Sequence, residues 1–409
     1  MVERLKNKRI LFVDHDEGRS GSTISLEYLL RAFIAKKYDC YVLTSKDAME
    51  SQPFLEAGAT LIDLRKWYSG TLMLGFHFTT TSSFFSWRGM RMMVSSIIRF
   101  FLGFIITRQV IKKIKPDLVY VNEYIMVQAS VAAYFSGVPS VIHIRSPFLK
   151  GDFGVRRRII SRLILAYNRF IIAITRIEAE QLNPYKEELE KILIVGEFFS
   201  PCYVSNDEKS VYRELFGLPK NKKIILMLGG IELVKGTIDF LRAAQLVISE
   251  RNDVIFVIAG KIKKVGNSED QAYFMQCMQI ADSLKENEGI RVLGEVADSL
   301  KLIAASDIVI SPSIQTHFSR PVIEAWGLGI PVIAAKTEHM KDLITHGVDG
   351  FLVDVHDYHS LSRYILLLLD NEELSKRLRI EGAKKAITNF NAERNTCVII
   401  DKCNSLFLS

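Results

Sequence analysis

The 409-residue sequence has few cysteines, and their positions exclude the sites that cysteine usually builds. Its five cysteines are scattered from Cys40 to Cys403, and no two have the C-x-x-C spacing of a zinc or redox site. An odd and dispersed set also provides no disulfide framework, so a reducing compartment is expected. The start of the chain shows no apolar run of the secretory type. These features predict a cytoplasmic location.

Several common motifs are missing as well. No G-x-G-x-x-G follows the first expected strand, which disfavours a nicotinamide dehydrogenase, and no Walker A loop occurs. We expect no metal and no other cofactor, because Lys235 and the N–H groups of a helix start could take the place of a metal at a diphosphate. Residues 67–87 and 124–144 carry no formal charge, but eight Ser and Thr residues interrupt the first, and Gly137 and Pro139 divide the second. Neither stretch is expected to span a membrane.

Acidic residues are scarce in one long segment. Residues 65–176 hold 17 Lys and Arg against three Asp and Glu. Nucleic acid and an anionic membrane surface both attract such a field, and a third reading is a basic face that only aids solubility. The aromatic residues of this segment lie in apolar runs rather than between basic residues, unlike a base-stacking platform. We therefore predict contact with an anionic membrane surface and not with nucleic acid.

Short β-branched runs alternate with helical patterns along the whole chain, which predicts an α/β protein with parallel sheets. The expected strands are residues 9–14, 40–45, 117–122, 139–144, 169–175, 191–195, 223–229, 254–260, 290–294, 307–311, 330–335 and 351–353. A polar break near residue 200 divides them into two doubly wound domains, 1–200 and 201–385. Residues 386–409 should form a helix that packs back across both domains. Ligands bind at the carboxyl ends of such strands, so a cleft between the two sheets is the expected site.

Three glycine- or proline-marked loops follow expected strands. Gly18 and Gly21 bracket a turn before the first helix, where the backbone either approaches a ligand or makes only a tight turn. A later strand ends in Gly229-Gly230, and Lys235 stands at the mouth of the next helix, a combination that suits a diphosphate. The alternative is that Lys235 is a solvated surface residue.

The third loop leads into "SRPVIEAWG", residues 319–327. Pro321 suits the first turn of a helix, which leaves the N–H groups of Ser319, Arg320, Val322 and Ile323 as candidates to face an anion. Glu324, one turn further on, is placed to accept hydrogen bonds from the two hydroxyls of a ribose. The alternative is that Glu324 pairs with a neighbouring Lys or Arg.

Residues 221–355 resemble the donor-binding domain of glycosyltransferase family 4. The resemblance rests on G-G-x4-K-G at 229–236, T-H-F-S-x4-E-A at 316–325, G-I-P-V at 329–332 and D-G-F-L-V at 349–353. It implies a GT-B fold with two Rossmann-like domains facing a cleft, and a retaining reaction on a nucleotide diphosphate sugar that needs no metal. In this family the departing diphosphate is thought to guide attack on the same face of the sugar.

The resemblance also assigns residues. Lys235 would hold the diphosphate, Glu324 the ribose, and backbone near Gly294 the nucleobase. The sugar would meet the loop of Thr316, His317 and Phe318. The donor-binding set is therefore Gly21, Gly229, Gly230, Lys235, Gly294, His317, Phe318, Ser319, Arg320, Val322 and Glu324. Three places depart from the family pattern. Gly230 replaces an Arg, Thr316 replaces a Glu, and Arg145 stands where a catalytic His is frequent, with His143 two residues earlier.

Thr316, Arg145 and His143 are the predicted catalytic residues. The function expected from these features is transfer of a sugar to a lipid-linked or polysaccharide acceptor, in cell-surface polysaccharide biosynthesis at the inner face of the membrane. Two alternatives remain at this stage. A non-catalytic relative that only binds a nucleotide sugar would explain Gly230 and Thr316, and a nucleic-acid-binding protein would explain the basic segment.

Overall fold

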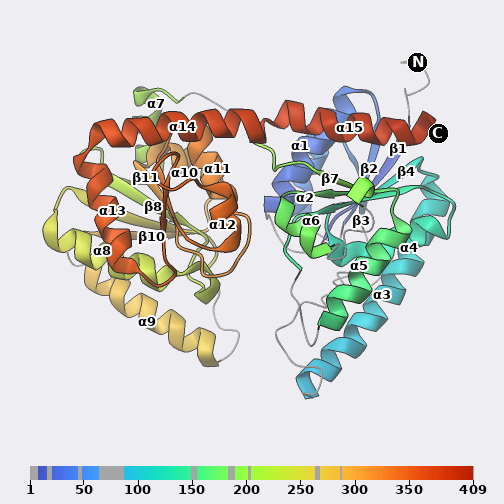
Figure 1. Cartoon of the computed structure of the whole chain (residues 1–409), viewed down its shortest axis with the longest axis horizontal. Coiled ribbons are helices and arrows are strands. Elements are labelled where there is room, and N and C mark those ends of the chain that lie inside the picture. The colour runs from blue at the N-terminus through green and yellow to red at the C-terminus, as the bar shows by residue number, and fades with distance from the viewer. Residues whose placement is uncertain are drawn as a thin grey trace. The chain divides into compact units, whose positions relative to one another are not determined.

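The computed structural model describes residues 8–15, 21–44, 48–63, 87–148, 154–182, 189–200, 204–262, 268–285 and 288–408. The chain divides into two compact units (Figure 1). The first unit is Met1–Phe198 with Ala392–Ser409, and the second is Phe199–Asn391. The closing segment is thus shared: its last helix belongs to the first unit, and residues 386–391 belong to the second.

The first unit is built on a parallel sheet, which has seven strands within the described residues, in the order β3-β2-β1-β4-β5-β6-β7. The strands are β1 (Arg9–Val13), β2 (Asp39–Thr44), β3 (Thr60–Asp63), β4 (Leu118–Val121), β5 (Ser140–Ile144), β6 (Phe170–Ala173) and β7 (Ile192–Ile194). The central strands β4, β5 and β6 are buried at every residue. Helices cover both faces of such a sheet, so its strands read as continuous apolar runs.

The helices of the first unit follow the strands and are α1 (Gly21–Ala35), α2 (Ala48–Glu56), α3 (Trp87–Ile114), α4 (Val127–Tyr134), α5 (Val155–Tyr167), α6 (Arg176–Leu182) and α15 (Ala392–Leu408). Short 3-10 turns lie at Tyr124–Met126 and Leu189–Lys191. Among the described residues, one helix segment, Gly89–Ile114, is long and apolar enough to cross a membrane by length and composition.

The second unit has a parallel sheet of six strands within the described residues, in the order β10-β9-β8-β11-β12-β13. Its strands are β8 (Lys223–Leu228), β9 (Val254–Ala259), β10 (Ile290–Gly294), β11 (Ile308–Ser311), β12 (Val332–Ala335) and β13 (Phe351–Val353). Its helices are α7 (Asn206–Leu215), α8 (Thr237–Glu250), α9 (Ser268–Lys285), α10 (Ser299–Ala305), α11 (Arg320–Gly327), α12 (Glu338–Leu343), α13 (Tyr358–Asp370) and α14 (Glu372–Phe390), with a 3-10 turn at Leu233–Lys235.

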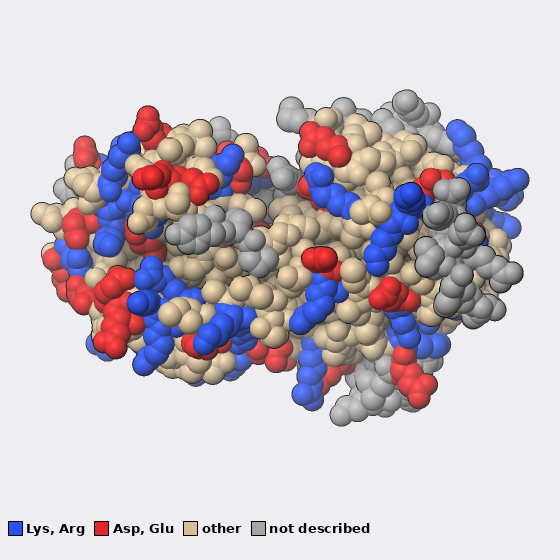
Figure 2. All heavy atoms as spheres, turned by 90° about the horizontal axis from the view of Figure 1, so that it is seen from above, with Lys and Arg blue, Asp and Glu red and all other residues tan. Residues whose placement is uncertain are grey.

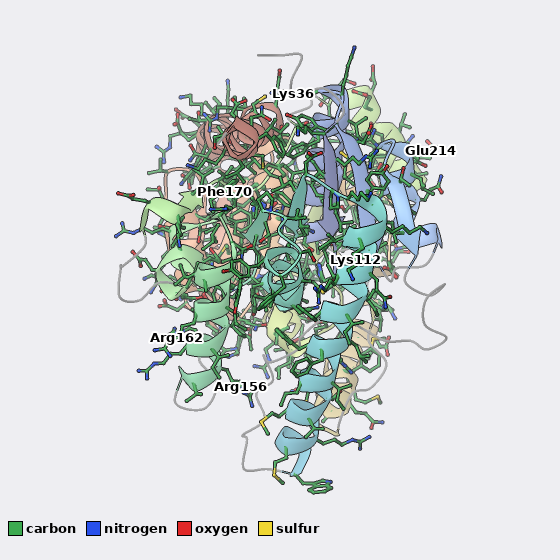
Figure 3. All side chains as sticks on the ribbon, turned by 90° about the vertical axis from the view of Figure 1, so that its right-hand side faces the viewer. Lys36, Lys112, Arg156, Arg162, Phe170 and Glu214 are labelled. Atoms are coloured by element: carbon green, nitrogen blue, oxygen red, sulfur yellow. The ribbon has the colours of Figure 1, made fainter. Side chains whose placement is uncertain are left out.

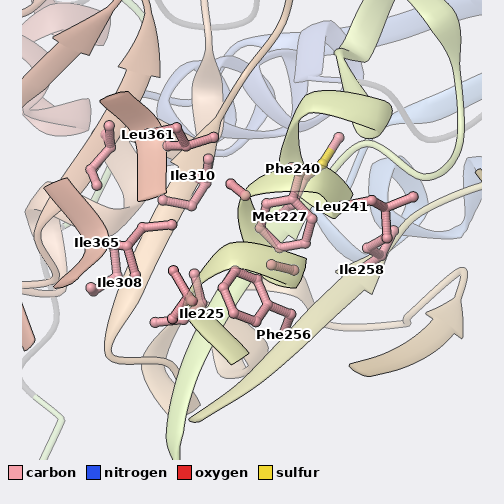
Figure 4. Packing of buried hydrophobic residues seen from close by; sticks show 14 of the residues in the cluster. Ile225, Met227, Phe240, Leu241, Phe256, Ile258, Ile308, Ile310, Leu361 and Ile365 are labelled. Carbon is pink, nitrogen blue, oxygen red and sulfur yellow. The ribbon is translucent and has the colours of Figure 1, made fainter. Parts of the chain in front are cut away.

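The core of the second unit fixes these helices against the sheet. Phe240 of α8 packs on Phe256 of β9, with ring centroids 5.3 Å apart, and Ile365 of α13 joins the same cluster (Figure 4). On the other face, α11 packs closely against α14. A side chain at Gly382 would overlap the Trp326 ring, because its Cβ would lie 2.3 Å from Trp326 Cδ1. This contact fixes the helix that carries Glu324.

The predicted fold class is confirmed, since both units are doubly wound parallel α/β structures of the GT-B class. Every strand expected from the sequence is present. One strand was not expected: β3 has four residues and lies at the edge of its sheet, too short to show a pattern. The aromatic segment 67–86 and Gly18 lie outside the described residues.

Candidate functional site

The strand order reverses once in each sheet, and Lys235 and Glu324 follow the two strands at the reversal point of the second sheet. In the second unit, β8 is flanked by β9 and by β11, so the loops that follow β8 and β11 leave the same edge side by side. Ligands of open α/β sheets bind at this kind of switch point. The loop after β8 carries Lys235, and the loop after β11 leads to Glu324.

Lys235 extends across Gly229 toward the loop that follows β11. A Cβ at Gly229 would lie 3.1 Å from Lys235 Cδ, and Lys235 Nζ donates a hydrogen bond to His317 Nε2 at 3.2 Å. His317 Nδ1 lies 3.2 Å from the carbonyl oxygen of Gln315. Burial and the charge of Lys235 lower the pKa of His317 to about 4. His317 is therefore neutral at pH 7, and it holds the Lys235 ammonium without adding charge.

Backbone N–H groups near Lys235 are already used. Gly229 N and Gly230 N both donate to the carbonyl of Ala259, at 2.9 and 3.0 Å, and Ile238 N donates to the Tyr273 hydroxyl at 2.9 Å. The helix mouth therefore offers an anion fewer backbone donors than the sequence suggested. Its principal cationic group is the Lys235 side chain.

Gly230 departs from the family pattern for a steric reason. Its φ is +72°, and a Cβ there would lie 2.1 Å from the carbonyl oxygen of Lys261. A side chain is strained at this φ and has no space at this contact. The backbone of this loop thus excludes an Arg at this position.

Glu324 lies in the first turns of α11 and is paired within its own helix. Arg320 Nε donates to Glu324 Oε1 at 2.7 Å, and the two side chains are only 10% and 5% exposed. This is the alternative that the sequence left open, a carboxylate neutralised by a neighbouring Arg. Val322 N donates to Ser319 O, so this N–H contributes to the helix rather than to a ligand. The Ser319 hydroxyl lies 2.9 Å from that of Ser311.

The loop from Thr316 to Phe318 is held by the elements around it. Thr316 Oγ1 lies 2.9 Å from Nδ1 of His339, a buried residue of α12. The Phe318 ring packs on Phe390, with centroids 5.8 Å apart. Gly294 ends β10 and accepts a hydrogen bond from Gly260 N at 2.7 Å. Thr316, His317, Lys235 and Glu324 thus follow β8 and β11, and Gly294 lies on the same carboxyl edge two strands from β8.

The predicted residues of the first unit occupy a buried polar network instead of an open surface. Arg145 Nη1 donates to Glu197 Oε1 at 2.7 Å, and Arg145 Nε donates to Asn122 Oδ1 at 3.1 Å. His143 Nδ1 accepts from the Tyr120 hydroxyl at 2.7 Å and lies 3.1 Å from Arg145 Nη2. Burial and Arg145 hold the pKa of His143 well below its usual range. With His143 fully buried and Arg145 almost so, these contacts favour positioning roles over contact with a substrate.

The network brings together residues that the sequence analysis did not select. Asn122 Nδ2 donates to Asp14 Oδ1 at 2.9 Å, and the Ser25 hydroxyl donates to Glu197 Oε2. Ser25 Oγ also lies 3.1 Å from the carbonyl oxygen of Gly21, which begins α1. Asp14 and Asn122 come directly after β1 and β4, the strands at the switch point of this sheet. The sequence could have indicated these two residues, because each stands at the end of an expected strand.

Glu123 follows Asn122 and is another buried acid that the sequence analysis passed over. It accepts hydrogen bonds from Tyr124 N at 2.8 Å and from the Ser146 hydroxyl at 2.9 Å. Burial raises the pKa of Glu123 to about 7, against the opposing influence of His15. This carboxyl therefore holds its proton to a higher pH than an exposed Glu does.

Comparison with known proteins agrees with this geometry. Residues 208–385 match the family Glycosyl transferases group 1. The matched region lies within the second unit. The match includes Lys235, His317 and Glu324, so the loops after β8 and β11 lie within the matched region.

Individual relatives extend the comparison. An Escherichia coli protein, UDP-Gal:alpha-D-GlcNAc-diphosphoundecaprenol alpha-1,3-galactosyltransferase, is 26% identical over 76% of this chain and 80% of its own length. The Bacillus anthracis N-acetyl-alpha-D-glucosaminyl L-malate synthase is 23% identical over 47% of this chain, and the chain spans about half (48%) of that relative. The crystal structure of Anabaena HepE in complex with UDP and glucose aligns with a TM-score of 0.76 at 18% identity, covering 98% of this chain and 100% of that one.

Proposed function

We propose that the protein is a retaining glycosyltransferase that moves a sugar from a nucleotide diphosphate sugar to a lipid-linked or polysaccharide acceptor. The observation that carries the proposal is Lys235, an ammonium group held by a neutral His317 at the switch point of a group 1 glycosyl transferase domain. A diphosphate placed there would accept a charge-assisted hydrogen bond from Lys235, stronger than the one that His317 now accepts.

The other residues take complementary roles in this proposal. Glu324 binds the ribose hydroxyls, backbone near Gly294 meets the nucleobase, and the loop from Thr316 to Phe318 meets the sugar. Lys235 offsets charge on the departing diphosphate, which itself guides attack on the same face of the sugar, so neither a protein nucleophile nor a metal is needed. Arg145, with His143 behind it, positions the strand ends of the first unit.

The names of relatives support the choice of substrates. The Escherichia coli relative carries a UDP sugar and a lipid diphosphate acceptor in its name, and a Staphylococcus aureus relative is named for capsular polysaccharide biosynthesis. We propose substrates of the same classes for this protein. An acceptor with a lipid anchor would place it at the inner face of the membrane as a peripheral protein.

Donor binding tests the proposal. Calorimetry with UDP and a panel of nucleoside diphosphate sugars should find at least one ligand, and Lys235→Ala should raise its Kd by about 10–100-fold, because a charge-assisted hydrogen bond contributes about 1.5–3 kcal/mol. Lys285→Ala removes an exposed lysine that pairs with Asp282 and should leave Kd unchanged. An unchanged Kd for Lys235→Ala would contradict the assignment.

A second candidate function is nucleotide-sugar binding without transfer. Thr316 stands where relatives have a carboxylate, and its hydroxyl lies against His339. A protein that binds a donor but neither hydrolyses nor transfers it, with any acceptor in a membrane extract, would support this candidate.

A further inference from the structure

One face of α3 presents a long row of exposed apolar side chains. Its members are Trp87, Met90, Val94, Ile97, Ile98, Phe101 and Ile105, each between 43% and 79% exposed. Their spacing of three and four residues places them in a single stripe along the helix. At a rise of 1.5 Å per residue, the stripe is about 27 Å long. A contiguous apolar surface of this kind marks a place where a partner binds.

The opposite face of α3 is committed to the core of the first unit. Ile106, Val110 and Ile111 are buried in its main apolar cluster, and Gly103 lies directly against the Gln128 side chain of α4. A helix whose second half packs on a sheet domain cannot also cross a bilayer, despite its length and apolar composition. The stripe is therefore suited to lie in an interface rather than to span it.

The charges around the stripe indicate which partner fits it. Neither α3 nor α5 contains an acidic residue. Arg108 and Lys112 continue the stripe at three- and four-residue steps beyond Ile105, and both are exposed. Elsewhere acidic and basic side chains are interspersed, as on the face shown in Figure 2. An apolar row that ends in cations matches a bilayer, with its acyl chains below anionic headgroups.

Helix α5 adds to the same side of the first unit. The amino-terminal ends of α3 and α5 project in the same direction, away from the sheet (Figure 3). Val155 and Ile159 on α5 are each 45% exposed, and Arg158 and Arg162 are exposed beside them. Arg156 is only 4% exposed, so it is not available to a membrane, unlike the rest of this basic run.

We propose that the α3 stripe and the first turns of α5, together the α3–α5 face, dock the protein on a bilayer that contains anionic lipid. The apolar half of α3 enters the outer part of the leaflet, and Arg108 and Lys112 lie at the level of the headgroups. The purpose of this face rests on the proposed function, because a lipid-linked acceptor is presented at such a surface. Its binding to lipid needs no substrate, so it can be measured separately from transfer.

Vesicle flotation tests the face directly. The full-length protein should float with vesicles of phosphatidylcholine containing phosphatidylglycerol, and much less with phosphatidylcholine alone. Phe101→Asp should weaken partitioning by at least about tenfold. Met275→Asp, at a residue of α9 that is equally exposed (60%), should leave it unchanged. Because Phe101 is 59% exposed, its replacement should not alter the melting temperature.

Charge neutralisation tests the headgroup contact. Arg108→Gln with Lys112→Gln should weaken partitioning by about 25-fold at low salt, about fivefold for each cation. Arg379→Gln with Lys384→Gln, two cations of α14 on the second unit, should not change it. Carbonate washing should release the bound protein from vesicles.

The fluorescence of Trp87 reports how deeply the α3 stripe enters the bilayer. Trp326 is fully buried and gives a constant background, and Trp67→Phe removes the remaining tryptophan. In that background, Trp87 emission should shift to the blue with anionic vesicles and be quenched by lipids brominated in the acyl chain.

Four results would overturn the proposal. They are no flotation of the unaltered protein, equal partitioning to neutral vesicles, flotation with unchanged Trp87 emission, and a stable dimer in solution that Phe101→Asp separates. Protein that floats but consumes no donor would refute the proposed function and leave the face standing. Protein that transfers sugar in solution but does not float with vesicles would refute the membrane-docking face and leave the proposed function standing.

Discussion

Replacement of Glu324 should have two effects, and the Arg320–Glu324 pair allows them to be separated. Glu324→Ala removes the carboxylate that pairs with the Arg320 guanidinium, whose side chain is only 10% exposed. Breaking a buried ion pair in this way costs about 3–5 kcal/mol. For a unit of this size the melting temperature falls by about 2–4 °C per kcal/mol, so the expected decrease is about 6–20 °C.

The catalytic effect should be independent of that loss. If Glu324 also binds two ribose hydroxyls, its replacement should lower kcat/KM by about 10²–10³, from two charge-assisted hydrogen bonds that are not fully additive. Thr316→Ala removes one neutral hydrogen bond and should cost only about tenfold.

A double variant separates stability from binding. Arg320→Met with Glu324→Leu replaces the pair by apolar side chains and should recover most of the melting temperature. Calorimetry well below that temperature should still show weak donor binding. Glu324→Gln, which keeps an oxygen for Arg320 Nε, should lose less stability than Glu324→Ala. Recovery of both stability and donor affinity in the double variant would refute the ribose assignment, because Glu324 would then serve only its partner.

Three further predictions follow from buried or strained groups. Burial raises the pKa of Glu123 to about 7, so its protonated form stabilises the fold below about pH 4.5, and this contribution is lost as the pH rises through 7. Glu123→Gln should therefore have the same free energy of unfolding as the unaltered protein at pH 4. At pH 8 its free energy of unfolding, measured by denaturant titration, should be higher by up to about 3 kcal/mol. Equal stability at pH 8 would contradict this. Lys235→Met should raise the pKa of His317 above about 4 in an NMR titration, since Lys235 is one cause of its lowering; an unchanged pKa would disprove the contact. Gly230→Arg should lower stability without improving donor affinity, because its Cβ would meet Lys261 O; tighter donor binding in calorimetry would show that the loop adapts.

The fold was predictable because buried parallel strands appear in the sequence as short, continuous apolar runs. The run Leu118–Val121 is apolar and buried at every residue, and runs like it recur between helical segments in both halves of the chain. The edge strand Thr60–Asp63 cannot be recognised in this way. At an edge only one neighbour pairs with the strand, and four residues are too few to show alternation.

The site was only partly predictable, since sequence spacing reports contacts within one element. Arg320 and Glu324 are four residues apart on a helix, so their pairing could be foreseen as an alternative. Lys235 and His317 are 82 residues apart and meet only because β8 and β11 are neighbours in the sheet. Arg145 was assigned to catalysis because it stands where the resembled family often has a His, but Glu197, which pairs with it, lies 52 residues away.

The most direct test of the central claim is transfer itself. Purified protein, a nucleoside diphosphate sugar that binds in calorimetry and a lipid extract should yield a glycosylated lipid and free nucleoside diphosphate. Proton NMR of the product should show the anomeric configuration of the donor. The Lys235→Ala protein should form this product far more slowly. A product with inverted configuration, or full transfer by the Lys235→Ala protein, would contradict the account.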